Sequence, residues 1–250
     1  MPEGDTLVRT ADALRVRLLG KRMVKARPYE KLTGATVTAV EPNGKHLLIR
    51  FDNGLVVHSH LRMTGIWYVY RPGEAWNRPA HQARLVLEAD DTVAVLFNAP
   101  TVELLREKEV DLSHLGPDLL SSEPDLDEVI SRARRAGARS LGELLLDQRV
   151  AAGIGNIYRC ESLWALRLDP WQQVEATDDD TLRRLYSEAR KQLQGGVRGH
   201  HAHARPRPAR TPLSALPDLD QHPPPGRAGA DHVLLPGVPE GRSDMISRWP

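Results

Sequence analysis

The hydrophobic repeat of this chain changes twice along its length, and that change limits the folds it can adopt. At the start of the chain, residues 2–20, apolar side chains recur at helical spacing and Gly20 ends the pattern: Leu7, Ala11, Leu14 and Leu18. From about 33 to 97 the repeat becomes two, as in strands. From about 125 to 194 it is helical again. The chain therefore reads as one helix, a run of strands and a helical region.

This order predicts an α+β fold with an N-terminal helix and an antiparallel β-sandwich. Turns such as Asp52-Asn53-Gly54 separate six strand-like segments: 36–40, 45–51, 54–58, 67–70, 83–87 and 93–97. We expect the sandwich domain to occupy residues 2–118, a linker 119–124, and an all-helical domain 125–196. The remaining residues, 197–250, hold 10 of the 19 prolines and show no lasting repeat, which predicts a disordered tail.

Composition excludes several classes of protein. The net charge is only +1, so the chain as a whole gives no signal for a nucleic-acid partner, and only local patterns can. Cys160 is the single cysteine, which excludes an intramolecular disulfide and a cysteine-rich metal site; we expect it to pack as a small hydrophobe. Three histidines of the tail could hold a metal, although a solvated stretch is the simpler reading: His200, His201 and His203. No apolar run reaches the length of a membrane span and no signal peptide opens the chain, so we expect a cytoplasmic protein.

The first residues carry a specific chemical possibility. Removal of Met1 would leave Pro2 with a free secondary amine. A free α-amino group has an ordinary pKa of about 8, which leaves a usable fraction unprotonated at neutral pH. Such an amine can attack C1′ of a sugar and form an iminium, and the neighbouring Glu3 could transfer protons. Taken alone, the pair is better explained as an ordinary start followed by a loop, and the rest of the chain reverses that interpretation.

A second informative segment is residues 145–164. We expect one helix to run into Gly153-Ile154-Gly155-Asn156 and another to begin there. Glycines allow a sharp turn and a close approach to a ligand, and the first amides of a helix bind phosphate. The alternative is a helical hairpin with a glycine corner.

Together these segments resemble the formamidopyrimidine-DNA glycosylase/endonuclease VIII family. The resemblance spans residues 2–196 and rests on four motifs in the family's order. They are the N-terminal catalytic sequence, the catalytic-lysine strand, the loop that enters the DNA stack, and the helix–two-turns–helix motif: Pro2-Glu3-Gly4, Gly44-Lys45-His46-Leu47-Leu48, His60-Leu61-Arg62-Met63-Thr64-Gly65, and residues 145–164.

The resemblance implies a DNA glycosylase and AP lyase that acts as a monomer on damaged double-stranded DNA near the nucleoid. It implies Pro2 as nucleophile, Glu3 as proton-transfer group and Lys45 as a cation near the phosphates or the sugar. Met63 would fill the space left by the extruded base. Further DNA contacts would come from Arg62, Arg149, Gly155, Asn156 and Arg159.

Alternatives stay open for individual residues and for the activity. Met63 could be a core methionine and Lys45 a solvated strand lysine. No strand-invading residue is assigned between 99 and 113. The opening Pro2-Glu3-Gly4-Asp5-Thr6 is closer to the endonuclease VIII branch, which implies oxidised pyrimidines as substrates. The alternative function is a non-catalytic nucleic-acid-binding protein, or an inactive remnant.

One departure concerns zinc. The family usually ends in a four-cysteine zinc finger, which a chain with one cysteine cannot build, so we expect no cofactor. Read one nucleotide out of frame, however, GC-rich codons of the tail give cysteines at four places with zinc-ribbon spacing: Leu213, Leu216, Leu235 and Val238. An arginine falls at Ala230 in that frame. We therefore hypothesise a frameshift near Gly195–Gly199 that replaced the finger; the alternative is a genuine disordered tail, and resequencing the gene decides between them.

Overall fold

The computed structural model of the chain describes residues 2–199. The predicted tail lies outside these residues except for its first three, and the frameshift hypothesis stays untested. The last helix runs to Val197, one residue into the predicted tail. Within residues 2–199, no helix has the length and apolarity needed to cross a membrane.

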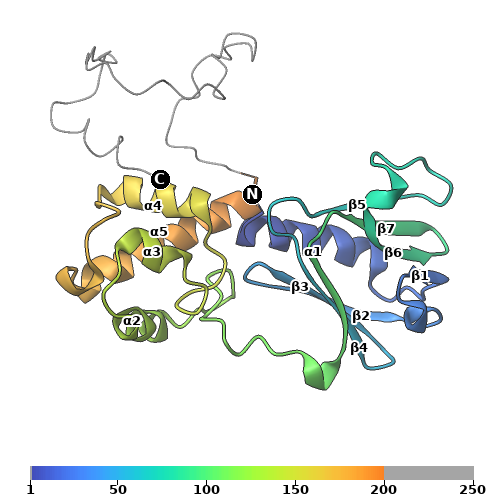
Figure 1. Cartoon of the computed structure of the whole chain (residues 1–250), viewed down its shortest axis with the longest axis horizontal. Helices are drawn as coiled ribbons and strands as arrows, with labels where there is room; N and C mark the ends of the chain where they lie inside the picture. Colours follow the sequence, from blue (N-terminus) through green and yellow to red (C-terminus); the bar gives the residue numbers. More distant parts are fainter. Residues whose placement is uncertain (1, 200–250) are drawn as a thin grey trace, which may run out of the picture. The chain divides into compact units, whose positions relative to one another are not determined.

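The N-terminal helix, α1 (Gly4–Leu18), buries the stripe that its sequence predicts. Leu7, Ala11, Leu14 and Leu18 are all fully buried and belong to the main hydrophobic core. The helix ends where Leu19 becomes extended and Gly20 takes a φ of +75°, a conformation that favours glycine. Only one face of α1 is apolar, so the helix packs that face alongside the sheets (Figure 1).

Two antiparallel four-stranded sheets follow α1, which confirms the predicted α+β class. One sheet has the order β1-β6-β7-β5: β1 (Lys25–Arg27), β5 (Ile66–Tyr70), β6 (Ala83–Ala89) and β7 (Thr92–Phe97). The other has the order β2-β3-β4-β8: β2 (Val37–Asn43), β3 (His46–Phe51), β4 (Leu55–His60) and β8 (Thr101–Arg106). Both sheets and α1 contribute to one core, which includes Leu47, Ile49, Leu87 and Leu96. The sheets therefore enclose a shared apolar interior, as in a sandwich.

The rest of the described chain is helical. Its α-helices are α2 (Leu126–Arg135), α3 (Leu141–Leu146), α4 (Asn156–Leu166) and α5 (Asp179–Val197). Side chains satisfy the first free amides of three of them: Asp125 accepts from Glu128 N at 2.9 Å, Asp178 accepts from Thr181 N at 2.7 Å, and Ser140 accepts from Glu143 N at 3.3 Å in a capping box. The cap residue of α4 is a glycine, which has no side chain to offer. Its amides take their partner from elsewhere in the chain.

Two details differ from the sequence-based expectation. The helix before the glycine corner ends at Leu146, so a nine-residue loop, 147–155, separates α3 from α4. It ends there because Asp147 adopts an extended conformation and its carboxylate accepts from the Arg149 amide at 3.0 Å, which starts a turn. Lys45, expected inside a strand, lies in the hairpin turn between β2 and β3. The predicted domain boundaries at 118 and 124 stay predictions.

Candidate active site and DNA interface

Glu3 is the most constrained polar residue of the candidate site. It precedes α1, is 1 % exposed, and its carboxylate lies at the N-terminus of α4. Oε2 accepts from Gly155 N at 2.8 Å and Tyr158 N at 3.3 Å, and Oε1 accepts from Ile157 N at 2.7 Å. The first amides of a helix have no partner within the helix and carry a partial positive charge, so a carboxylate is a favourable ligand for them. Glu3 thus caps a helix more than 150 residues away.

Opposing influences set the proton affinity of this carboxylate. Burial raises the pKa of Glu3 above its ordinary value, while the α4 amides and the positive charge of Lys45 lower it; burial has the largest effect. Burial also lowers the pKa of Lys45, and the charge of Glu3 acts against that decrease. Glu3 and Lys45 are therefore an electrostatically coupled pair, and the raised pKa of Glu3 suits a group that gains and releases a proton during a reaction.

Close backbone contacts hold Glu3 and Lys45 near the same loop. Gly4 N donates to Gly153 O at 2.9 Å, which fixes the start of α1 on the loop 147–155. Gly44, beside Lys45, has a φ of +55°, and a Cβ there would lie 2.8 Å from the Cβ of Ala152. Only glycine permits both this conformation and this approach. The hairpin turn with Lys45 therefore packs against the same loop as Glu3.

Asp118 secures this arrangement, although sequence reasoning treated it only as the end of a domain. Its Oδ2 accepts from Gly44 N at 2.8 Å and its Oδ1 accepts from Leu120 N at 2.8 Å. The one carboxylate thus joins the Lys45 turn to the chain that leads into α2. Nothing in the local sequence marks it, because both partners are backbone amides.

The other residues expected to contact DNA differ in their exposure and in their hydrogen-bond partners. Asn156 is exposed at the first position of α4, where a phosphate can reach it, and Arg159 is half-buried one turn further on. The amide of Gly155 donates to Glu3 and is therefore not free for a phosphate in this structure. Arg149 is bound in a bidentate manner to Asp147 through Nε (2.9 Å) and Nη2 (2.7 Å).

Met63 lies on the exposed loop between β4 and β5. It is 76 % exposed, which excludes the alternative of a core methionine. Its neighbour Arg62 adopts a φ of +46° and is also exposed, and its amide donates to His60 Nδ1 at 3.0 Å. Thr64 Oγ1 donates to Asn98 O at 2.9 Å, which fixes the other side of the loop. An apolar side chain is thus presented to solvent from a braced loop.

Pro2 is half-buried immediately before Glu3. It precedes in the chain the residue whose carboxylate lies at the N-terminus of α4. Pro2, Glu3 and Lys45 are thus brought to one region, at the junction of α1, the β2–β3 turn and the N-terminus of α4.

Four histidines border the Lys45 turn, and sequence reasoning did not identify them as a group. We call them the histidine group: His46, His58, His60 and His114. His46 Nδ1 lies 2.8 Å from His58 Nε2, and His58 Nδ1 lies 3.0 Å from Glu103 Oε2. A carboxylate oxygen can only accept, so His58 Nδ1 donates to Glu103 Oε2, and His58 links Glu103 to His46.

Two of these imidazoles, His46 and His60, are neutral in the folded protein at neutral pH. Burial, followed by the charges of the other three histidines and Arg62, lowers the pKa of His46 to about 3. Burial, then Arg62, Lys45 and His58, lowers the pKa of His60 to about 4. The positive charge in this region is therefore supplied by Lys45 and Arg62, not by His46 or His60.

Comparison with known proteins agrees with this fold. Residues 1–101 match the formamidopyrimidine-DNA glycosylase N-terminal domain, and residues 115–205 match the formamidopyrimidine-DNA glycosylase H2TH domain. A probable endonuclease 8 of Streptomyces coelicolor is 44 % identical over 203 residues, covering 78 % of this chain and 74 % of the relative. Endonuclease 8 of Salmonella agona is 34 % identical over 199 residues, covering 74 % and 75 %.

Solved structures show the same fold. The formamidopyrimidine-DNA glycosylase of Lactococcus lactis, bound non-covalently to DNA that contains an AP site, superposes with a TM-score of 0.70 at 20 % identity, covering 80 % of this chain and 83 % of that one. The architecture and the matched domains thus define a DNA glycosylase of the helix–two-turns–helix class. The chain belongs to the formamidopyrimidine-DNA glycosylase/endonuclease 8 family.

Proposed function

We propose that this chain is a bifunctional DNA glycosylase and AP lyase that removes oxidised bases, mainly pyrimidines, from double-stranded DNA. The observation that carries the proposal is the buried Glu3 carboxylate, held beside Pro2 by the amides of α4 and with a raised pKa. The preference for pyrimidines is supported by the relatives named endonuclease 8 and by the opening Pro2–Thr6.

The reaction starts once Met1 is removed and the Pro2 nitrogen is free. That nitrogen attacks C1′ of the damaged nucleotide, the bond from C1′ to the base breaks, and the base leaves with a proton that Glu3 can supply. The Pro2 nitrogen then gives up its proton, the C1′–O4′ bond of the sugar ring breaks as O4′ takes a proton and becomes a hydroxyl, and the nitrogen lone pair forms the iminium. This iminium acidifies C2′. Loss of a proton from C2′ expels the 3′ phosphate, and water then releases the enzyme from the sugar. Protons and leaving groups move without net oxidation, so the sequence of steps needs no redox cofactor.

Docking would use exposed and half-buried residues around this centre. Asn156 on α4, with Arg62 and Arg159, would contact phosphates, and Lys45 would lie near the phosphates or the sugar. Met63 can enter the space left by the extruded base, which offsets part of the unstacking cost. We also propose that the chain acts as a monomer and, having one cysteine, without a four-cysteine zinc site.

Borohydride trapping on duplexes with an oxidised pyrimidine tests the proposal, since only an iminium is captured covalently. We expect trapping by the native chain and a loss of at least about tenfold for Pro2→Gly, while duplex binding stays within a few fold. No trapping by the native chain despite duplex binding would favour the non-catalytic binding protein. Undiminished trapping by Pro2→Gly would assign the nucleophile to another amine.

Glu3→Gln separates the two chemical steps. We expect base excision to be lost and cleavage at a preformed abasic site to be retained in part, because an abasic sugar has no base to protonate. Both substrates are compared in one strand-nicking assay. An equal loss on the two substrates would contradict a role for Glu3 in base departure.

A further inference from the structure

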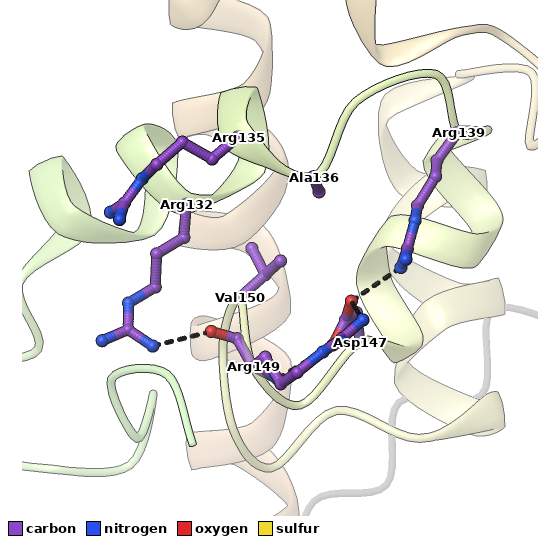
Figure 2. Close-up of a pocket in the computed structure, with 7 residues that line it drawn as sticks. All are labelled: Arg132, Arg135, Ala136, Arg139, Asp147, Arg149 and Val150. Atoms are coloured by element: carbon purple, nitrogen blue, oxygen red, sulfur yellow. Dashed lines mark hydrogen bonds and ion pairs between the residues drawn. The ribbon is translucent and has the colours of Figure 1, made fainter. Parts of the chain in front are cut away.

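A cavity of about 400 Å³ lies in the helical region, built from residues that the proposed chemistry does not use. Its lining contains four arginines and one acid: Arg132, Arg135, Arg139, Arg149 and Asp147, with Ala136 and Val150 completing it. Figure 2 shows Arg132 and Arg135 extending from α2, with Arg139 and Arg149 approaching Asp147 on the other side. We call this the arginine cavity.

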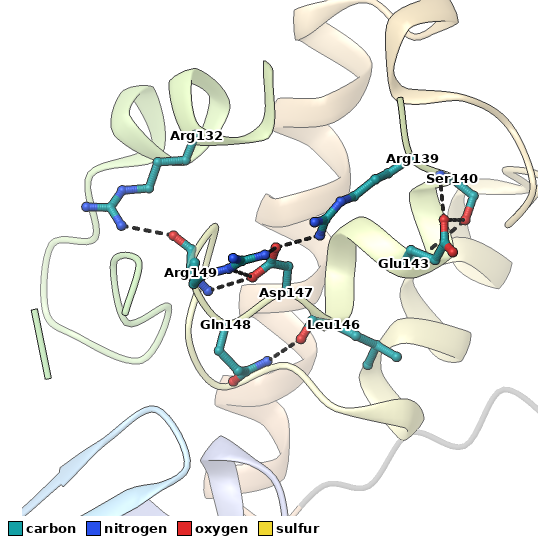
Figure 3. Close-up of polar contacts among 8 residues, drawn as sticks. All are labelled: Arg132, Arg139, Ser140, Glu143, Leu146, Asp147, Gln148 and Arg149. Atoms are coloured by element: carbon teal, nitrogen blue, oxygen red, sulfur yellow. Dashed lines mark hydrogen bonds and ion pairs between the residues drawn. The ribbon is translucent and has the colours of Figure 1, made fainter. Parts of the chain in front are cut away.

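The arginine cavity has an excess of positive charge. Asp147 Oδ2 accepts hydrogen bonds from Arg139 Nη1 at 2.6 Å and from Arg149 Nη2 at 2.7 Å (Figure 3). Glu128, just outside the lining, is shared by Arg132 at 2.7 Å and Arg135 at 3.2 Å. Glu143, also outside the lining, interacts electrostatically with Arg139. Four guanidinium groups thus still outnumber the three carboxylates that act on them, which leaves an excess of positive charge.

The guanidinium groups are held in place rather than loosely solvated. Arg132 Nη1 donates to two backbone carbonyls, Leu115 O at 3.1 Å and Arg149 O at 2.9 Å. Asp147, with a side chain only 9 % exposed, orients Arg139 and Arg149 through both of its oxygens. Hydrogen bonds from Arg149 lower the pKa of Asp147 to about 2, so this carboxylate stays charged at neutral pH. Ordered guanidinium groups lose less side-chain freedom when they bind an anion.

The mouth of the arginine cavity is open to a ligand. The side chains of Arg135 and Arg149 are 65 % and 64 % exposed, and each uses only part of its guanidinium for its carboxylate. Planar guanidinium groups bind phosphate oxygens in pairs, which neither a lysine nor a neutral side chain can do. The cavity therefore combines an excess of positive charge, oriented donors and access.

We propose that the arginine cavity binds a phosphate group, and that its source is the DNA backbone outside the damaged nucleotide. The choice of source rests on the proposed function and on chain continuity: Arg149 belongs to the loop 147–155 that leads directly to Asn156 and to the α4 amides held by Glu3. A duplex docked at α4 would gain a second anchor on the same helical region. Free inorganic phosphate has the same chemistry and is the source to be distinguished.

The test compares the native chain with the double variant Arg135→Gln, Arg149→Gln. A control variant, Arg17→Gln with Arg71→Gln, removes the same charge from exposed positions outside the cavity. Binding to an abasic duplex is measured by fluorescence anisotropy over a salt series. One duplex is short, and another is longer by about one helical turn, roughly 10 base pairs, on each side. Thermal unfolding with inorganic phosphate against chloride at equal ionic strength measures binding of the free anion.

We expect the cavity variant to bind the longer duplex about tenfold more weakly and with a salt slope reduced by about 1 to 2, while the control variant changes little. The native chain, but not the cavity variant, should also be stabilised by phosphate. Stabilisation by phosphate with unchanged DNA binding would overturn the DNA source and leave free phosphate. If the cavity variant keeps both normal DNA binding and stabilisation by phosphate, the proposed phosphate site is wrong. Arg135→Lys, which keeps the charge but not the paired donors, should lose part of the effect if geometry matters.

These readouts are independent of the chemistry at Pro2. If borohydride trapping fails while the cavity variant still weakens DNA binding, the proposed function is wrong and the site stands. If trapping succeeds and the cavity variant binds the longer duplex normally, the proposed enzymatic function is supported, but the DNA backbone is not the source of the phosphate.

Discussion

Replacing Gly155 by alanine should disturb the candidate active site without straining the backbone. Gly155 has a φ of −127°, an extended value that alanine adopts freely. A Cβ at this position would lie 2.6 Å from Oε1 and 2.7 Å from Cγ of Glu3, where ordinary contact begins at 3.4 Å. The Glu3 side chain is fully buried and cannot swing into solvent without leaving the helix terminus.

The size of the effect follows from these distances. The carboxylate must retreat by about 0.8 Å, which lengthens its bonds of 2.8 Å and 2.7 Å to Gly155 N and Ile157 N beyond hydrogen-bonding range. A hydrogen bond to a charged group contributes about 1.5–3 kcal/mol. With partial rehydration of the displaced carboxylate, we expect Gly155→Ala to lower the free energy of unfolding by about 2–4 kcal/mol. Trapping on damaged DNA should also fall, because Glu3 no longer lies in its place.

Urea unfolding of a double-mutant cycle checks the cause. In a Glu3→Ala background the clash no longer exists, so Gly155→Ala should then cost less than about 0.5 kcal/mol. Asn156→Ala, on the exposed neighbouring position, is the control and should be close to neutral in stability. If the Gly155 and Glu3 effects add, the contact with Glu3 is not the cause and the reasoning is refuted.

Two further predictions concern pH and the exposed loop. In the folded protein the pKa of His46 is about 3 and that of His60 is about 4, both below the unfolded value of about 6.5. At a pH between the folded and unfolded values, the unfolded state therefore binds more protons than the folded state. Stability should therefore be fully present above pH 6.5 and fall as the pH drops toward 4; urea midpoints at pH 7.5 and 5 measure this, and His46→Gln should reduce the difference. A flat profile would contradict burial of neutral imidazoles. Met63→Ala should leave the thermal midpoint nearly unchanged, because the side chain is exposed, but should weaken excision of a damaged base several-fold. Normal excision by that variant would remove Met63 from the DNA contacts.

Periodicity predicted most of the fold because most elements bury one face. The stripe of α1 and the period-two pattern of the predicted strands are local properties, and the helix and all six strands are present in the structure. In β7 all six residues are buried, so this strand covers apolar surface on both of its faces. Two strands were missed. In β1 only Ala26 of three residues is buried, and in β8 (Thr101–Arg106) none is, so neither carries an apolar alternation. Both exist because a neighbouring strand pairs with them, β6 for the first and β4 for the second, and the local sequence does not reveal that pairing.

The candidate site was predictable in its members but not in its connections. The motifs named Pro2, Glu3, Lys45 and Asn156, and the first three lie in one region. That the α4 amides bind Glu3 could not be read from the sequence, because more than 150 residues separate the partners. The histidine group escaped notice for a similar reason: register alone brings His46 opposite His60 across the β3–β4 ladder.

The position of Glu3 links the stability of the fold to the chemistry proposed for it. Burial favours the protonated form of this carboxylate and has the largest effect on its pKa, which lies above the ordinary value. The α4 amides and Lys45 oppose that increase, so the groups that hold the helical region against α1 also limit the proton affinity of Glu3. We therefore expect a change that loosens α4 to alter the proton affinity of Glu3, the residue proposed here to transfer protons. For the same reason, glycine at position 155 serves the chemistry as much as the turn: it leaves room for the carboxylate whose proton affinity the helix controls.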